Sequence, residues 1–430
     1  MQNKLKILII GGGGREHAIG WKVAKSPRAG EIFFAPGNAG TAQIGKNIEI
    51  VATDIAKLIE FAKREQIDLT LALPDDPLAM GIVDEFQKVG LRIWGPTKAA
   101  AELEWSKAFS KNFMEKHNLP TAKFKTFTQY EEAKQYLSEQ SMPIVIKASG
   151  LALGKGVVIC QSPEEAQAAL EDMMLKKSFG NAGMEVVIEE FLDGTEISVH
   201  AFSDGKTFKM FPPSQDHKKI GEEDTGPNTG GIGTISPLPF VHSVLLKEIE
   251  DKIVAPTIAA MMKESKPFQG VIYPGLMLSH GHLKILEYNA RLGDPETQTY
   301  MRLLETDILD IFDACIDQKL SELEIKWSHL SACTIILTSA GYPGNYEKGE
   351  VITGIETAEK NSNVVVFHAG TKLNESGSLV TNGGRVLGVS ATGSTLKIAL
   401  ATAYEAISKI HFEGIYYRRD IGKKSLTQRK

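Results

Sequence analysis

The first hundred residues alternate short apolar runs with amphipathic stretches, and this alternation constrains the fold more strongly than any other feature. The apolar runs read KILII, EIFFA, LTLAL and LRIWG, and stretches with helical periodicity, such as REHAIGWKVAKS and DIAKLIEFAKREQ, lie between them. Short apolar strands that alternate with amphipathic helices form a parallel sheet with helices on both faces. We therefore predict a doubly wound, Rossmann-like α/β domain over residues 1–103.

The rest of the chain divides into four further segments. A chain of 430 residues is too long for one hydrophobic core, so several domains are expected. A helical linker over 104–122 leads to a strand–helix–strand block over 123–192, and a block over 193–328 carries long strands and glycine-rich loops. A small α+β domain is expected over 329–430, with no further domain after it and with the basic sequence GKKSLTQRK as a frayed tail.

Composition and charge exclude several classes of protein. The chain is 42% apolar and 23% charged, as soluble globular proteins are. A net charge of −5 offers no basic face to nucleic acid, and no apolar stretch is long enough to span a membrane. Cys160, Cys315 and Cys333 lie far apart in apolar runs, which is typical of buried thiols in a reducing compartment. Because the N-terminus also lacks a cleavable signal sequence, we expect a cytoplasmic protein.

Four glycines follow the first apolar run, in the sequence KILIIGGGGREHA. A dinucleotide-binding turn needs three glycines spaced G-x-G-x-x-G and an acidic residue at the end of the second strand. Aligning Gly12 and Gly14 with the first two glycines puts His17 at the third position, and the second strand ends in APG, with no carboxylate. The pattern therefore disfavours a nicotinamide cofactor. It leaves a turn whose backbone N–H groups, aided by Arg15, bind a single phosphate, or a tight strand-to-helix turn without a ligand.

The sequence GLALGKG, residues 150–156, resembles a phosphate-binding P-loop but lacks two of its features. A P-loop continues with Ser or Thr after its lysine and opens a helix, whereas Gly156 follows here and the next residues, VVIC, are strand-like. We predict a glycine loop that joins two strands, carries Lys155 at its tip and folds over phosphates as a lid. Lys147, in the apolar strand before it, is either a solvent-facing lysine or a second phosphate ligand.

The sequence LKILEYNARLGDPETQ, residues 283–298, gives the strongest chemical signal. In a strand alternate residues share a face, so Glu287, Asn289 and Arg291 point one way and Leu286 points the other. A carboxylate beside an amide oxygen suits a hard cation such as Mg²⁺, and the arginine suits a phosphate or a carboxylate. The alternative is a surface Glu–Arg pair on a half-exposed strand, which the charged turn GDPE after the strand argues against.

Two polar stretches fit the same picture of a nucleotide site. The sequence EEFLDGTEIS, residues 189–198, joins two blocks, so its backbone around Glu190–Leu192 is placed to contact a base and Glu196 to accept from ribose; a simple charged turn is the alternative. The stretch over 214–233 is long, polar and glycine-rich, and a loop of this size inside a compact domain is usually functional or disordered.

These stretches together resemble the ATP-grasp family, and within it the ligases that join glycine to 5-phosphoribosylamine. The resemblance covers essentially the whole chain, and its most specific stretch is RLGDPETQ. The matching stretches, in order, are GGGGREHA, PGNAGT, GPTKAAAELEWSKAFSK, IVIKASGLALGKGV, EEFLDGTE, SQDHKK, DTGPNTGGIG, EYNARLGDPETQ, HAGTKL and TNGGRVLGV.

The resemblance implies a fold and a reaction. The fold is an N-terminal Rossmann-like domain, an ATP-grasp domain pair with a mobile lid, and a small C-terminal α+β domain. In the reaction, ATP phosphorylates the carboxylate of glycine, and the amine of 5-phosphoribosylamine attacks the glycyl phosphate to give glycinamide ribonucleotide, ADP and phosphate. This is the second step of de novo purine synthesis, and it uses Mg²⁺ or Mn²⁺. A monomer, or at most a weak dimer, is expected.

The resemblance also implies which residues act, by their match to the family's motifs. Those expected at ATP are Lys107, Lys147, Gly154, Lys155, Glu189, Glu190, Leu192 and Glu196, and those expected at the metal are Glu287 and Asn289. Those expected to take part in catalysis are Arg291, Asp294, Asp216 and Lys218. Those expected at the substrates are Gly12, Gly13, Gly14, Arg15, Glu16, Gly37, Asn38, Ala39, Gly40, Pro227, Asn228, Thr229, Gly230 and Gly231.

The chain departs from the family pattern at a few positions. Ser149 stands where the family usually has Asp, Leu153 where it has a small residue, and Trp105 where it has Gly. The usual GPEAPL reads LPDDPL here, with Leu73 for Gly and Asp75 for Glu. These changes put the affinity for the amine, or its identity, in question. The alternatives are an ATP-grasp ligase for another carboxylate or amine, a nonenzymatic nucleotide sensor and a nicotinamide-dependent oxidoreductase.

Overall fold

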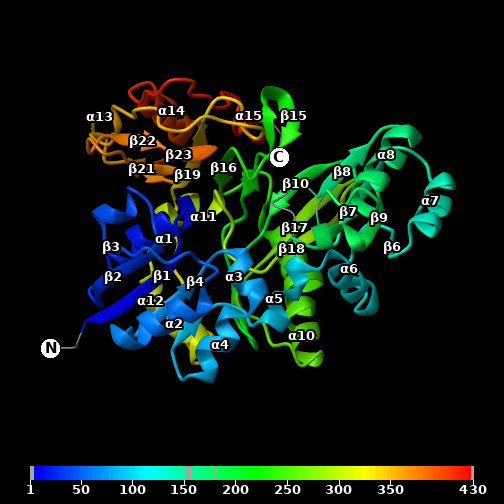
Figure 1. Ribbon diagram of the computed structural model, residues 1–430, viewed down its shortest axis with the longest axis horizontal. Coiled ribbons are helices and arrows are strands. Elements are labelled where there is room, and N and C mark those ends of the chain that lie inside the picture. Colours follow the sequence, from blue (N-terminus) through cyan, green and yellow to red (C-terminus); the bar gives the residue numbers. More distant parts are fainter. Residues whose placement is uncertain (1–3, 152–155, 179, 428–430) are drawn as a thin grey trace.

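The structure is a computed structural model that describes residues 4–151, 156–178 and 180–427 (Figure 1). The N-terminal sheet domain and the C-terminal domain lie one above the other in this view, and the central strands lie beside them. A smaller lobe, built from residues in the 123–192 range, projects to one side. The predicted α/β class and the order of its parts are confirmed.

The N-terminal domain is a five-stranded parallel sheet in the order β3-β2-β1-β4-β5. Its strands are β1 Leu5–Gly11, β2 Ala29–Pro36, β3 Lys46–Asn47, β4 Leu69–Ala72 and β5 Ile93–Trp94. The segments between them form α1 Gly14–Val23, η1 Thr41–Gln43, α2 Ile55–Arg64, α3 Asp75–Met80 and α4 Ile82–Lys88. The glycine turn and the PGNAG stretch therefore follow the carboxyl ends of two neighbouring strands, β1 and β2.

The predicted helical linker is two helices, not one. Helix α5, Lys98–Trp105, ends where α6, Lys107–Lys116, begins, and Ser106 caps α6 by accepting from the Phe109 amide at 3.2 Å. A serine in extended conformation is a favourable N-cap, because its oxygen satisfies an amide that has no helical partner. The break places Lys107 at the first position of α6, and the N-terminus of this helix contacts the lid lobe at Ser149.

The lid lobe is a four-stranded antiparallel sheet with its own small core. Its strands run β6 Phe124–Phe127, β9 Val186–Glu190, β7 Ile144–Ala148 and β8 Val157–Cys160, and the lobe also contains α7 Tyr130–Ser138, α8 Pro163–Met174 and η2 Gly180–Met184. Strands β7 and β8 are antiparallel neighbours, as expected for two strands joined by a glycine loop. A core separate from the rest of the molecule is what a moving lid requires, and its motion stays a prediction.

The central sheet carries the predicted metal strand. Its order is β10-β17-β11-β12, with β18 paired to β17. The strands are β10 Thr195–Ser198, β11 Ala201–Asp204, β12 Phe208–Met210, β17 Gln269–Ser279 and β18 His282–Asn289. The helical elements of this part are α9 Ser243–Ile249, η4 Glu250–Val254, α10 Ala255–Lys263, α11 Glu296–Leu303, α12 Ile308–Ile316 and η5 Leu320–Glu322.

The C-terminal sheet recruits strands from the segment before it. Its order is β13-β16-β19-β23-β20, with β13 Gln215–Asp216, β16 Gly233–Ser236, β19 Ser331–Thr338, β20 Val364–His368 and β23 Arg385–Gly393. Helices α13 Ile355–Ala358 and α14 Leu396–Ile407 and the hairpin β21 Thr371–Leu373 with β22 Leu379–Thr381 complete this part. Because β13 and β16 precede residue 328, this sheet crosses the expected domain boundary, and the domain limits stay a prediction.

Two expectations about irregular segments are corrected. The long polar loop contains a hairpin, β14 Lys219–Gly221 and β15 Thr225–Asn228, around the short helix η3 Glu222–Asp224. The C-terminal sequence is not a frayed tail over its described part, since helix α15, Lys423–Thr427, follows buried Arg418. Arg418 donates to the Lys219 carbonyl at 3.0 Å and to Asp224 Oδ1 at 2.9 Å, so it holds this hairpin against the C-terminal segment.

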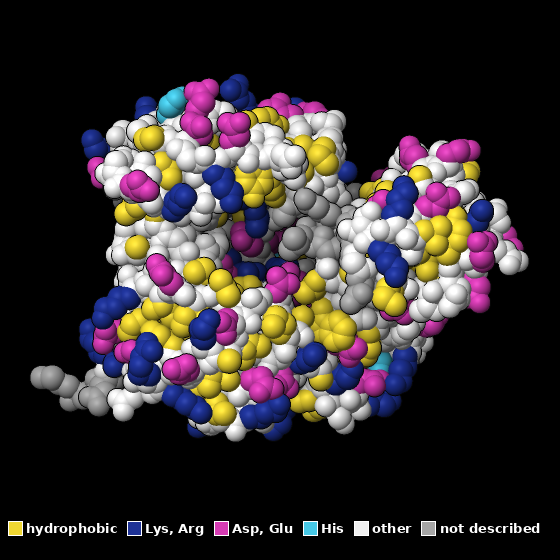
Figure 2. Space-filling view, in the orientation of Figure 1, with side chains coloured by type: hydrophobic (Ala, Val, Ile, Leu, Met, Phe, Trp, Pro, Cys, Tyr) yellow, Lys and Arg dark blue, Asp and Glu magenta, His cyan; other side chains and the backbone are white. Residues whose placement is uncertain are grey.

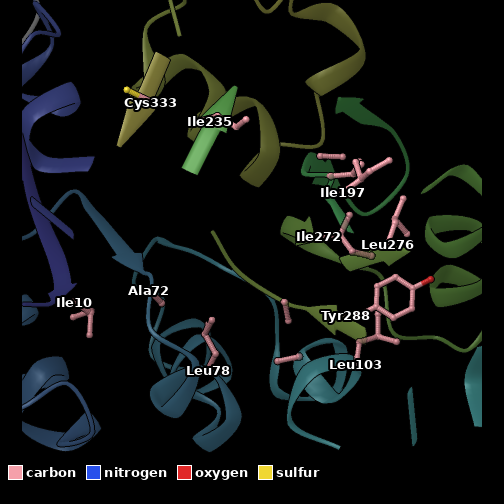
Figure 3. Packing of buried hydrophobic residues seen from close by; sticks show 14 of the residues in the cluster. Ile10, Ala72, Leu78, Leu103, Ile197, Ile235, Ile272, Leu276, Tyr288 and Cys333 are labelled. Atoms are coloured by element: carbon pink, nitrogen blue, oxygen red, sulfur yellow. The ribbon is translucent and has the colours of Figure 1, made fainter. Parts of the chain in front are cut away.

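A continuous apolar core links the N-terminal, central and C-terminal parts. Figure 3 shows Leu103 beside Tyr288, Ile10 at the far left with Ala72 and Leu78 between, and Ile235 and Cys333 above. The three cysteines are free and buried, as predicted. Among the described residues, no helix is long and apolar enough to cross a membrane.

Candidate active site

Two cavities meet at Asp294, which lines both. The smaller, of about 360 Å³, lies between the N-terminal glycine turn and the C-terminal domain. The larger, of about 540 Å³, lies between the lid lobe and the central sheet. Figure 2 shows the surface hollowed between the C-terminal domain at the top and the N-terminal domain below it, with acidic and basic side chains at the floor.

Backbone groups of the glycine turn form one wall of the smaller cavity. Gly12, Gly13, Gly14, Gly37 and Asn38 line it. A side chain at position 12 would not fit, because its Cβ would lie 2.5 Å from the Gly37 carbonyl oxygen. Two loops that approach this closely expose backbone N–H groups at the start of α1, and such a helix terminus attracts an anion.

The opposite wall comes from the C-terminal domain, which the sequence reasoning left out of the site. Its lining residues are Tyr342, Ala369, Gly370, Thr371, Asn382 and Arg385. Arg385 donates to the Asp294 carbonyl oxygen at 2.7 Å and forms an ion pair with the Asp294 carboxylate at 3.2 Å. The signal for this wall was present in the stretches HAGTKL and TNGGRVLGV, which place glycines and polar residues at the ends of two strands.

Four of the N-terminal residues expected at the substrates do not line this cavity. Arg15 is buried, with its Nε 2.6 Å from Glu16 Oε1 and its guanidinium donating to the Leu292 carbonyl at 3.1 Å. The Glu16 carboxylate accepts from the Gly13 amide at 2.7 Å and so caps the helix. Ala39 and Gly40 do not line the cavity either. These residues support the turn and do not face its space.

The predicted metal strand faces the larger cavity. Glu287 and Asn289 both line it, as their shared face predicts. Leu286 lines it too, contrary to the alternation expected from sequence, because the register of β18 against β17 shifts between Gly275 and Leu276. Burial opposes ionisation of Glu287, but nearby cations, Lys218 above all, lower its pKa to about 2.

Three lysines converge on this cavity, and two of them share the Glu189 carboxylate. Lys147 lies 2.6 Å from Glu189 Oε1, and Lys111 lies 2.5 Å from Glu189 Oε2. Lys107 donates to the Gly150 carbonyl at 3.2 Å, and burial lowers its pKa although Glu287 opposes the shift. Lys111 was not predicted, because a lysine in an amphipathic helix carries no signal of its own.

An apolar surface lies at the side of the cavity where a base was expected. Leu192 and Met277 are buried together with Ala122, and Leu286 packs against them. Leu192, Met277 and Leu286 line the cavity. Glu190 also lines it, while its carboxylate is bound by Lys284 at 2.6 Å.

The polar hairpin closes the far side. Asp216, Lys218, Asn228, Thr229 and Gly230 line the cavity, whereas Pro227 and Gly231 do not. The Lys218 ammonium lies 3.4 Å from Glu196 and 3.6 Å from Glu287, so it bridges the predicted ribose and metal carboxylates. Burial and the neighbouring Glu296 raise the pKa of Asp216 well above its usual value.

Arg291 lines the larger cavity, and Asp294, three residues later, lines both cavities. The Arg291 guanidinium lies 2.9 Å from Glu104 and 3.4 Å from Asn289 Oδ1. Burial opposes ionisation of Asp294, but Arg385 and Arg15 lower its pKa, so it stays charged. Glu104 was not predicted; it lies in α5, which sequence alone gives no reason to place at the site.

The departures from the family pattern fit locally where the structure describes them. Ser149 accepts from the Ala108 amide through its hydroxyl at 3.1 Å, and its carbonyl accepts from the Lys107 amide at 2.7 Å, so it holds the start of α6. Asp75 lines the larger cavity, where burial opposes its ionisation but Arg291 lowers its pKa. The Trp105 indole donates to the Lys98 carbonyl at 3.2 Å. Leu153, Gly154 and Lys155 lie outside the described residues.

Comparison with known proteins agrees with this geometry. Residues 5–104, 105–297 and 332–424 match the N domain, the ATP-grasp (A) domain and the C domain of phosphoribosylglycinamide synthetase. Proteins named phosphoribosylamine–glycine ligase are 47% identical in Vibrio parahaemolyticus and 48% identical in Pasteurella multocida, with 99% of both chains covered in each case.

Solved structures give the same assignment. The crystal structure of phosphoribosylamine–glycine ligase from Thermotoga maritima superposes with a TM-score of 0.80 at 36% identity and covers 97% of this chain and 100% of its own. A biotin carboxylase domain from Hydrogenobacter thermophilus, 14% identical, shares the fold with a TM-score of 0.73 over 98% of this chain and 93% of its own. The resemblance predicted from sequence is confirmed, and the chain belongs to the phosphoribosylglycinamide synthetase family of ATP-grasp ligases.

Proposed function

We propose that this protein ligates glycine to 5-phosphoribosylamine at the expense of ATP, through glycyl phosphate, in the second step of purine synthesis. The observation that carries the proposal is the pair of cavities that meet at Asp294. One offers backbone groups and Arg385, which suit a phosphate-bearing acceptor, and the other offers lysines and carboxylates suited to a nucleotide and a metal. Family membership supports the same reaction and leaves the oxidoreductase and sensor alternatives without support.

The nucleotide would bind in the larger cavity. Leu192, Met277 and Leu286 would contact the adenine, and Glu196 the ribose hydroxyls. Lys107 and Lys147 would neutralise phosphate oxygens, which is the main task of a protein in phosphoryl transfer. Lys147 is already held over the cavity by Glu189 and by the Leu286 carbonyl, which accepts from it at 3.1 Å.

Glu287 and Asn289 fit a divalent cation. Glu287 keeps its charge in the folded protein, with a pKa of about 2 set against burial by the surrounding cations, and Asn289 adds an amide oxygen. Among the residues that the structure describes, no group of three or more acidic, histidine or cysteine side chains forms a complete metal site. Such a sparse set suits Mg²⁺, which takes water and phosphate oxygens as its other ligands, and Mn²⁺ accepts the same oxygens. When bound, the ion would neutralise the charge that develops on the transferred phosphoryl group.

The two chemical steps follow from the order of the side chains. A glycine carboxylate oxygen attacks the γ-phosphorus while the bond to the ADP oxygen breaks, and Arg291 and Lys218 stabilise the acyl phosphate. The acceptor amine then attacks the acyl carbon, the carbon–oxygen bond to phosphate breaks, and the ammonium proton is lost to the medium. Asp294, which stays ionised, is placed to accept a hydrogen bond from the attacking amine.

One assay tests the proposal. Purified protein with ATP, Mg²⁺, glycine and freshly generated phosphoribosylamine should release ADP only when both glycine and the amine are present. Absence of glycine-dependent ADP release would overturn the proposal. Release with another amino acid in place of glycine, or with another amine, would instead favour an ATP-grasp ligase of different specificity. A parallel series with Mn²⁺ compares the two ions.

A further inference from the structure

His17 occupies the place of the third glycine of a dinucleotide fingerprint and contacts the C-terminal domain. The amide of His368, at the end of β20, donates to His17 Nδ1 at 2.7 Å. The His17 ring also lies edge-on to Phe367, with centroids 5.7 Å apart. His17 and His368 are 351 positions apart in the chain, so their hydrogen bond exists only because the two domains dock.

The contact satisfies an open sheet edge. Strand β20 is the last strand of the C-terminal sheet, and edge strands present backbone groups without a partner strand. The N-terminal domain supplies partners for both groups of His368: His17 accepts from its N–H, and the Asn38 amide donates to its carbonyl at 2.9 Å. Asn38 also donates to the Gly12 carbonyl at 2.9 Å, so one side chain ties the glycine turn to β20.

These bonds lie directly beside one wall of the smaller cavity. Ala369, Gly370 and Thr371 follow His368 directly and form the wall opposite the glycine turn. At the narrow end of the cavity a Cβ on Gly14 would lie 3.6 Å from the Ala369 Cβ. A Cβ on Gly40 would lie 2.4 Å from His17 Cε1, so only glycine at position 40 leaves room for the ring.

We infer that His17 is a positioning residue for the phosphate-bearing acceptor: by accepting from the His368 amide, it holds the C-terminal wall at the distance at which both walls contact the phosphate. The inference rests on the function proposed above. His17 does not line the cavity, so it acts through the 368–371 backbone. Burial and the nearby His368 lower the pKa of His17 to about 3, so the ring is neutral and Nδ1 is free to accept.

The test compares variants that differ in the acceptor atom at one position. His17→Leu removes the acceptor, and loss of the partner of a buried amide should raise the KM for phosphoribosylamine about 10- to 100-fold. The KM for ATP and for glycine and the value of kcat should change less than about threefold, because the larger cavity is untouched. His17→Asn restores an oxygen near the position of Nδ1 and should recover most of the lost affinity. If His17→Leu does not fold, His17→Gln, whose oxygen lies one bond too far, replaces it in the comparison with His17→Asn.

The control is Trp21→Leu, in the same helix. Trp21 contacts Phe367 of the same strand, with ring centroids 5.7 Å apart, but lies away from the cavity lining. It should lower thermal stability without changing the KM for phosphoribosylamine.

Three results would each overturn the inference. They are the same rise in KM for phosphoribosylamine in Trp21→Leu, equal rises in KM for all three substrates in His17→Leu, and no recovery of affinity in His17→Asn. The unsubstituted protein separates this outcome from failure of the proposed function: if it releases no glycine-dependent ADP, the function is wrong, and if it does while His17→Leu behaves like it, only the role of His17 is wrong.

Discussion

The two cavities that meet at Asp294 differ in the groups that they offer to a charged ligand. The smaller is built largely from main chain: glycines of two loops face a glycine and polar side chains from another domain. The larger is built from side chains that are already paired, with Glu189 between two lysines and Lys218 between two carboxylates. Main-chain donors are held in place by the fold, although the Gly13 amide already donates to Glu16 Oε2 at 2.7 Å. Paired ions, in contrast, must trade one partner for the ligand.

This difference indicates which kind of substitution should impair ligand binding in each cavity. A site built largely from main chain depends less on any one side chain, so it should fail when a methyl group is added or when its two walls move apart. A side-chain site fails when one charge is removed, because the group left behind is buried without a partner. The following predictions test this contrast, beginning with the largest expected effect.

The largest effect is expected at Glu287. Glu287→Ala removes the carboxylate proposed to hold the metal and should lower kcat about 10³-fold or more, as loss of a group that stabilises developing charge does. Thermal unfolding should show an unchanged fold, because this side chain faces the cavity. Glu287→Gln keeps the size without the charge and serves as the control for packing. Activity within tenfold of the unsubstituted protein would mean that the metal site lies elsewhere.

The next effect is expected at the glycine turn. Gly12→Ala would bring a methyl group to 2.5 Å from the Gly37 carbonyl oxygen, so one loop must move. We expect the KM for phosphoribosylamine to rise about 10- to 100-fold, with a loss of stability of about 1–3 kcal/mol, while the KM for ATP stays unchanged. Gly13→Ala should have less effect, because its methyl group would meet the Glu16 carboxylate at 2.8 Å, and a side chain can shift. A rise in the KM for ATP instead would exchange the roles of the two cavities.

A smaller effect is expected at Lys111, which shares Glu189 with Lys147. Lys111→Met leaves Glu189 to Lys147 alone, and the tighter pair should hold Lys147 away from the phosphates. The KM for ATP should rise about tenfold, the equivalent of one charged hydrogen bond. Lys116→Met is the matched control, since Lys116 lies in the same helix but pairs on the surface with Glu264 at 2.6 Å. Equal ATP affinity in both variants would show that Glu189 does not restrain Lys147.

The last prediction concerns the stability of the acceptor side in acid, and not the reaction. Burial lowers the pKa of His17 to about 3 and that of His368 to about 4, below the unfolded value of 6.5. The unfolded chain therefore binds these protons first, and the free energy of unfolding should fall as the pH drops from 6.5 towards about 4. His17→Asn should reduce this slope by up to about 1.4 kcal/mol per pH unit, as urea unfolding over this range would measure. His411→Asn, on the surface, is the control, and an unchanged slope in His17→Asn would contradict the assignment.

The sequence predicts the parts of the molecule that depend on neighbours in the chain. Alternating apolar runs predicted the parallel sheet that contains β1, though not its strand order, because a strand followed by a helix has few ways to bury both apolar faces. The shared face of Glu287 and Asn289 followed from strand periodicity. The failure of the P-loop pattern predicted a glycine loop between two strands, and the pairing of β7 with β8 agrees with this. The lid function of that loop and the phosphate turn stay predictions. The prediction that Leu286 points away from the cavity was wrong, because a single sequence does not reveal a shift in strand register.

What only the tertiary structure decided is which side chains meet across long stretches of chain. Arg15 looked like a phosphate ligand, yet it turns inward because the Leu292 carbonyl, 277 residues away, accepts from it. Lys111 and Glu104 enter the site through the docking of α5 and α6, and β20 forms a wall because His17 and Asn38 satisfy its open edge. Local patterns specify elements because helix and strand geometry repeat over a few residues. The partners of buried charges and edge strands depend on how those elements pack. No short stretch of sequence contains that information.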